Sequence, residues 1–135
     1  TYSLVPYDQW IEKLGGVALR VRFGLQRNHY DRLIHFSYGA LVILPAMELL
    51  RAVAPPRGVW RWLLPFFFIL SHSALYELIE WGAAEAFGGG LGTAYVGTQG
   101  DEWDSQKDMA CAGAGALFTM ALIGLSQLAG SLKNR

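Results

Sequence analysis

Acidic side chains are concentrated in one stretch of this chain, next to segments apolar enough for a membrane. Seven of the eleven carboxylates lie between positions 71 and 115. An ionised side chain beside hydrocarbon must pair with an opposite charge or become neutral. We therefore expect chemistry in this stretch, with the rest of the chain as its scaffold. The seven are Glu77, Glu80, Glu85, Asp101, Glu102, Asp104 and Asp108.

The polar residues near three apolar segments recur with helical spacing. Residues three and four positions apart share one face of a helix. Each apolar segment therefore carries a polar face at one of its ends. The sets with this spacing are Asp31, His35 and Tyr38; Ser73, Glu77 and Glu80; His72, Tyr76 and Glu80; and Asp104, Asp108 and Cys111.

The composition indicates a membrane protein. Hydrophobic residues make up 53% of the 135 residues and charged residues only 16%, whereas soluble domains carry about a quarter charged residues. The formal net charge is zero, so nothing indicates nucleic acid as a partner, and a single cysteine excludes an internal disulfide. We predict an all-α, polytopic membrane fold in one domain, with spans over 29–54, 63–87 and 105–129 after an arm over 1–28.

The arm carries one apolar stripe over residues 7–23, interrupted by Gly15 and Gly16. It is too polar to cross a bilayer, so the pattern predicts an amphipathic helix lying in the headgroup plane. The alternative is a helix packed on a partner protein. The stripe is formed by Tyr7, Trp10, Ile11, Leu14, Val17, Ala18 and Val21.

Two short connections join the spans, a proline-rich loop over 54–62 and a glycine-rich turn over 88–100. An up-down-up arrangement follows, and it brings the three polar ends to one membrane surface. Lipid does not accept such residues, so they should turn inward and form one polar pocket. Its predicted members are Asp31, His35, Tyr38, His72, Tyr76, Glu77, Glu80, Asp101, Asp104, Gln106 and Asp108.

Several kinds of chemistry suit this pocket. Imidazole and carboxylate groups bind divalent metals, and we name His35, Glu77, Glu80 and Asp108 as the candidate ligands. Acid–base chemistry and proton transfer use the same groups. The plain structural alternative is that they only hold three helices together, and the dense zinc motif HExxH is absent from the sequence.

Carboxylates this close cannot all remain charged without a cation. Either a cation lies among them, or at least one carboxylate is protonated at neutral pH. We favour an internal network anchored by His35, Glu77, Glu80 and Asp108. The candidate cations are a metal ion, Arg32, Lys107 or a protonated His35 or His72.

The distribution of basic residues predicts the orientation. Arg57 and Arg61 in the proline-rich loop, with the basic C-terminus, place both of these on the cytoplasmic side, while the acidic turn has a lone Lys107. The acidic turn and the pocket would then face outward. Basic residues of the arm lie on the same side as the pocket, so they favour the opposite orientation.

Three blocks of sequence resemble the YjdF-like family of bacterial inner-membrane proteins. They are RNHYDRLIHFSYG, ALYELIEW and GTQGDEWDSQKDM, in that order. The resemblance implies a multi-pass protein of the inner membrane, of which this chain is the C-terminal part. The family has no established activity, so the resemblance implies no reaction.

A weaker likeness is to VanZ-like membrane proteins. It implies a link to cell-envelope chemistry. The residues that carry it are Asp31, His35, Phe36, Glu77, Asp104, Asp108 and Gly113.

Two functions from different classes follow from these patterns. The first is an integral inner-membrane protein whose pocket acts on a lipid-linked or small polar molecule, with a divalent metal as a candidate cofactor. The second is a non-catalytic accessory or structural subunit of a larger membrane complex. The expected partners are membrane lipid and further membrane subunits, with no nucleic acid.

Overall fold

The structure is a computed structural model that describes residues 6–18, 21–22, 24, 29–88 and 101–133. Within these residues the chain forms α1 (Tyr7–Lys13), α3 (Tyr30–Val53), α4 (Trp60–Phe87) and α6 (Asp104–Lys133). The last three helices are each long and apolar enough to cross a membrane. The fold is therefore all-α, a short N-terminal helix followed by three spans, as the sequence predicts.

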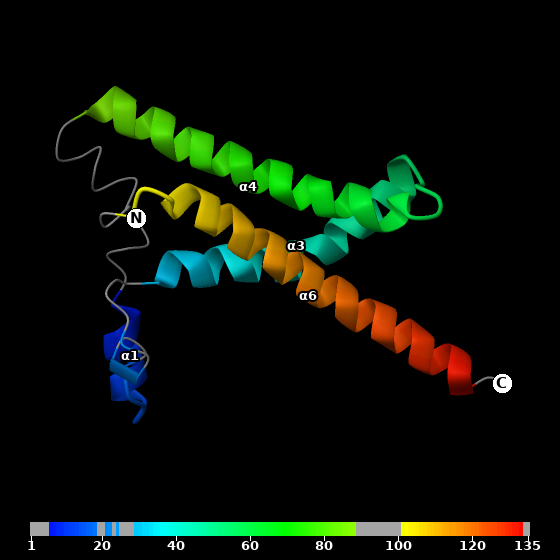
Figure 1. The fold of residues 1–135 in the computed structure, drawn as a ribbon, viewed down its shortest axis with the longest axis horizontal. Coiled ribbons are helices and arrows are strands. Elements are labelled where there is room, and N and C mark those ends of the chain that lie inside the picture. Colours follow the sequence, from blue (N-terminus) through cyan, green and yellow to red (C-terminus); the bar gives the residue numbers. More distant parts are fainter. Residues whose placement is uncertain (1–5, 19–20, 23, 25–28, 89–100, 134–135) are drawn as a thin grey trace.

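The three spans run up, down and up. Figure 1 shows α4 running opposite to α3 and α6, so that the start of α3, the end of α4 and the start of α6 lie at the same end of the bundle. These are the three ends that carry the polar faces. The glycine-rich turn predicted over 88–100 lies, apart from Gly88, outside the described residues. The proline-rich loop is shorter than predicted because α4 already begins at Trp60.

Two glycines bring the backbones of α3 and α6 into direct contact. A Cβ atom on Gly39 would overlap the carbonyl oxygen of Ala112, and one on Gly115 would overlap that of Phe36. The hydroxyl of Thr119 also donates a hydrogen bond of 2.7 Å to the carbonyl oxygen of Ala40. Small residues let membrane helices approach this closely. This contact fixes α3 and α6 as a pair, and α4 packs against both.

The hydrophobic core lies below the polar end of the bundle. Ile43 of α3 and Ile69 of α4 are fully buried in it. Large apolar side chains elsewhere on the spans face outward, where a bilayer would cover them. The buried core residues are Ile43, Ala46, Met47, Ile69, Ala112 and Ala116.

The arm differs from the helix predicted over 7–23. Helix α1 ends at Lys13, and Gly15 adopts a φ of 83°, a left-handed conformation that favours glycine. The apolar periodicity continues past the two glycines, but their conformational freedom ends the helix between its two halves. The prediction of one continuous helix was therefore wrong.

Helix α1 docks on the first turn of α3. The ring of Tyr7, which is buried, stacks on Tyr30 with 5.8 Å between centroids, and Trp10 meets the same ring edge-on. Figure 1 shows α1 lying crosswise to the spans at the end where the polar faces meet. Leu14 is 88% exposed. The position of the arm in the headgroup plane stays a prediction.

The glycine contact predicts a difference between two matched substitutions on α6. Gly115→Ala forces a methyl group into the α3 backbone, and overpacking of this kind costs ~1–3 kcal/mol. Gly124→Ala adds the same methyl group where nothing lies within reach, and it gains up to ~1 kcal/mol of helix propensity. We expect thermal unfolding in detergent to show a lower Tm for Gly115→Ala only. Equal Tm values for the two variants would contradict the backbone contact.

The predicted orientation is tested with single cysteines at the two ends of the bundle. Glu102 and Arg57 are both exposed, one at the polar end and one in the opposite loop. In a Cys111→Ala background, an impermeant maleimide should label Glu102→Cys in intact cells. Arg57→Cys should be labelled only after permeabilisation, because the proline-rich loop is expected in the cytoplasm. The inverse pattern would reverse the orientation.

Candidate functional site

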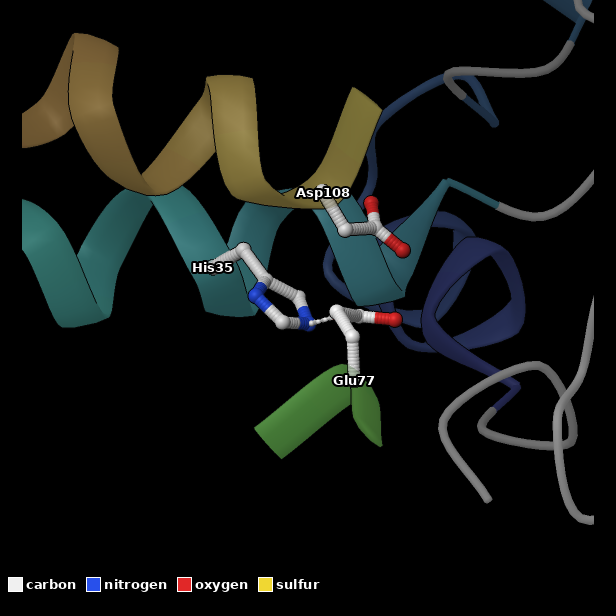
Figure 2. A group of neighbouring side chains, drawn as sticks. All are labelled: His35, Glu77 and Asp108. Carbon is white, nitrogen blue, oxygen red and sulfur yellow. Dashed lines mark ion pairs between the residues drawn. The ribbon is translucent and has the colours of Figure 1, made fainter. Parts of the chain in front are cut away.

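Three buried ionisable side chains, one from each span, meet at the polar end of the bundle. They are His35 of α3, Glu77 of α4 and Asp108 of α6, and each is more than nine-tenths buried. One ligand atom of each lies within 4.8 Å of the other two. Figure 2 shows the imidazole directed at the Glu77 carboxyl, with the Asp108 carboxyl beside it. The three side chains share one environment, as the helical spacing predicts.

Two carboxyl oxygens in this group have no hydrogen-bond partner among the described residues. Nε2 of His35 approaches Oε1 of Glu77 to 3.3 Å, but not with the alignment of a hydrogen bond, and Oδ1 of Asp108 is likewise unpartnered. A buried polar atom left without a partner costs ~1–3 kcal/mol. The group therefore has spare acceptor capacity for a cation or a proton.

A second group of carboxylates shares Asp108 with the first. Ligand atoms of Asp31, Asp104 and Asp108 also lie within 4.8 Å of one another, and all three residues are buried. Arg32 reaches into this group. Its Nη2 lies 3.4 Å from Oδ1 of Asp104, and its Nε lies 3.8 Å from Oδ1 of Asp108. A guanidinium thus offsets part of the charge on this side of Asp108.

Arg32 is the site residue that the sequence analysis left out of the pocket. It appears there only as a candidate cation and not as a member of the pocket. The structure turns its side chain inward to three aspartates, with Nη2 2.7 Å from Oδ2 of Asp101. Its position one residue after Asp31 and three before His35 was the available signal.

Lys107 of α6, another of the candidate cations, pairs outside the buried groups. Its Nζ donates to both carboxyl oxygens of Asp101, at 2.8 and 2.7 Å, just before α6 begins. These bonds, with the Trp103 backbone N–H and the Arg32 guanidinium, hold the pKa of Asp101 well below its usual range. A depressed pKa means that this pairing persists through the neutral range and is lost only in strong acid.

A partly open cavity of ≈ 230 Å³ lies between α3 and α4, next to the buried groups. His35 belongs to both, and its ring meets Tyr76 edge-on with 5.6 Å between centroids. The cavity therefore adjoins the ionisable centre through one side chain. Its lining residues are Ile34, His35, Tyr38, His72, Ser73 and Tyr76.

Nine of the eleven predicted pocket residues fall into three sets. Five meet in the two buried groups, namely Asp31, His35, Glu77, Asp104 and Asp108. Asp101 is joined to them through Arg32. Tyr38, His72 and Tyr76 line the cavity instead.

The other two predicted members, Gln106 and Glu80, belong to none of these sets. Gln106 is exposed, because it lies two positions from both Asp104 and Asp108 and so on another face of α6. Glu80 is half-buried and belongs to neither group of metal-ligating atoms among the described residues. His72 is exposed, and its Nδ1 lies 3.1 Å from the Phe68 carbonyl oxygen of its own helix.

Comparison with known proteins identifies the family. A family model described as "Predicted membrane protein (DUF2238)" matches residues 1–128. The chain belongs to this family. It is also 42% identical over 126 residues to the inner membrane protein YjdF of Escherichia coli (strain K12), an alignment that covers 91% of this chain and 55% of the relative. The chain thus spans about half the length of that relative. No solved structure matches it.

These matches confirm the resemblance to YjdF-like proteins and the location in the bacterial inner membrane. The protein is an integral membrane protein of an uncharacterised family, with three candidate spans and a buried cluster of His, Asp and Glu side chains. The likeness to VanZ-like proteins stays a prediction.

The position of Arg32 predicts an unequal effect of removing two cations. Arg32→Gln leaves Asp104 and Asp108 without this neighbouring cation, whereas Lys107→Gln removes a half-exposed pair. We expect Lys107→Gln to lower the free energy of unfolding by the ~0–1 kcal/mol of exposed pairs. Arg32→Gln should cost more, up to the ~3–5 kcal/mol of broken buried pairs.

Urea or thermal unfolding in detergent measures both variants. Asp104→Asn in the Arg32→Gln background should recover part of the loss, because it removes one of the uncompensated charges. Equal losses for the two single variants would show that Arg32 does not serve the buried carboxylates.

Proposed function

We propose that this protein binds a divalent cation through His35, Glu77 and Asp108 and uses the centre on a lipid-linked or small polar molecule near one membrane surface. One observation carries the proposal. Three ligand atoms from three different helices lie within 4.8 Å of one another, and Oε1 of Glu77 and Oδ1 of Asp108 have no hydrogen-bond partner in the part of the chain that the structure describes. A purely structural network would be expected to satisfy these oxygens.

The donor set suits a borderline divalent metal. One imidazole nitrogen and two carboxylate oxygens are ligands that zinc, manganese and iron accept. Three protein ligands leave coordination positions for water or a substrate, which is the pattern of catalytic rather than structural sites. A bound cation would also neutralise carboxylates that the surrounding bilayer disfavours. When bound, such a metal supplies Lewis acidity and an activated water molecule.

The protein's own residues would orient this centre. The glycine contact between α3 and α6 restrains the two helices that carry His35 and Asp108. Arg32 contacts Asp108 from the other side and adds positive charge at the margin of the site. A guanidinium in that place attracts an anionic headgroup or phosphate ester.

The depth of the site supports a substrate with a polar headgroup. His35 lies five residues after the start of α3 and Asp108 four after the start of α6, so both are about 6–8 Å inside their helices at 1.5 Å per residue. The hydrocarbon core of a bilayer is about 30 Å thick. The site therefore lies near one surface, where the polar part of a lipid-linked molecule and water both reach it.

Metal binding tests the proposal directly. We expect the purified protein, dialysed against Zn²⁺ or Mn²⁺, to retain about one metal ion per chain. Glu77→Gln and Asp108→Asn should each weaken binding by at least ~10-fold, as loss of a ligand does. Glu85→Gln is the matched control, because Glu85 is an exposed carboxylate on the same helix as Glu77.

Elemental analysis and the metal-dependent rise in Tm give two independent measurements. The Tm of each metal-free variant shows whether the substitution has damaged the fold. A wild-type protein that retains no metal, or a Glu85→Gln protein that loses as much as Glu77→Gln, would contradict the proposed cation site.

The accessory-subunit function is the second candidate, and one observation favours it. At most 28% of each span's most apolar window is buried inside the chain, so lipid or other helices must cover the rest. A partner chain that co-purifies in a fixed ratio, together with absence of bound metal, would support this function over the first.

A further inference from the structure

The cavity between α3 and α4 has two chemically different parts. Ile34, Tyr38 and Tyr76 supply a mainly apolar wall, while His35 and His72 are the lining residues with an imidazole ring. A mainly apolar cavity beside a polar centre matches an amphiphilic molecule, with a chain at one end and a headgroup at the other. The polar part adjoins the proposed cation site because His35 belongs to both.

Polar surface is scarce in this cavity. Ser73 belongs to the lining, but it is only 2% exposed and its hydroxyl oxygen has almost no accessible surface, so a molecule in the cavity does not reach it. His35 also lines the cavity of ≈ 230 Å³ and belongs to the buried group with Glu77 and Asp108. The polar end of an occupant would therefore lie at His35.

The surroundings of the cavity select a lipid as the occupant. The cavity is partly open, and it lies along the seam between two helices that are long and apolar enough to span a membrane. Tyr38 lies eight residues into α3, or about 12 Å from its start at 1.5 Å per residue. At that depth the medium beside the seam is the upper part of the acyl chains. An apolar wall does not favour filling by water.

We propose that this cavity holds one acyl chain of a phospholipid, with the ester and phosphate end directed at His35. The inference deepens the proposed function, on which it rests, by naming a phosphate-ester lipid as the substrate class of the same site. Tyr38 and Tyr76 suit the boundary, since a phenol combines an apolar ring with a polar tip.

Photo-crosslinking of lipid to the reconstituted protein tests the inference. The vesicles contain phosphatidylethanolamine and phosphatidylglycerol, with a trace of phosphatidylglycerol that carries a diazirine on one acyl chain. We expect peptide mapping to place several-fold more label on residues 34–38 and 72–76 than on Leu122 and Leu125. These two leucines are exposed on α6 and report general contact with lipid.

Matched variants separate the cavity from the bilayer at large. Ile34→Trp adds bulk to the lining of the cavity and should reduce its label several-fold, while Leu33→Trp places the same bulk on an exposed neighbouring position. Ile34→Trp should also lower the amount of phospholipid that stays bound in native mass spectrometry. Equal labelling of all faces, or equal effects of the two tryptophan variants, would overturn the inference.

Metal content measured on the same samples keeps the two proposals distinguishable. Ile34→Trp should still bind Zn²⁺, because it alters none of the three ligands. Metal binding without selective labelling overturns the lipid inference and leaves the cation site standing. Selective labelling without metal binding supports the lipid cavity and overturns the cation site.

Discussion

The intolerance of hydrocarbon for charge governs this structure. Five ionisable residues sit on helices that are otherwise apolar, and a bilayer would penalise each of them on an outward face. They are buried against one another instead, at the end of the bundle where three polar faces meet (Figure 1). Turning them inward creates a second problem, since like charges in a low-dielectric interior repel. Arg32 offsets part of that charge next to Asp104 and Asp108.

The close pairing of α3 and α6 makes this arrangement specific. Gly39 and Gly115 allow the two backbones to touch, which holds His35 and Asp108 in fixed relation a short distance above the contact. The third side chain of the group, Glu77, comes from α4, whose Ile69 and Pro65 are fully buried where it packs on that pair. The arrangement of the three ionisable side chains therefore depends on residues that carry no chemistry themselves. A looser α3–α6 contact would separate the ligands without changing any of them.

Asp108 joins the two halves of the site. On one side it faces His35 and Glu77, whose spare acceptor capacity suits a cation, and on the other it faces Asp31, Asp104 and Arg32. The Arg32 guanidinium thus supplies positive charge on one side of Asp108, and on the other side lies the group that we propose binds a divalent cation. The adjoining cavity gives the centre an apolar approach from the side of the bundle. Water could therefore reach the site from the polar end of the bundle, and lipid could reach it through the cavity between α3 and α4.

The sequence by itself determined the spans, their up-down-up order and the convergence of His35, Glu77 and Asp108. Hydropathy and helical spacing are local properties, and lipid leaves inward burial as the remaining choice for such residues. The tertiary structure decided which polar residues share atoms. Glu80 lies one turn after Glu77 on the same face of α4, yet it is only half-buried and joins neither buried group, while Arg32 turns inward to the aspartates. Side-chain direction depends on how neighbouring helices pack, so spacing alone could not rank these residues or reveal the cavity beside them.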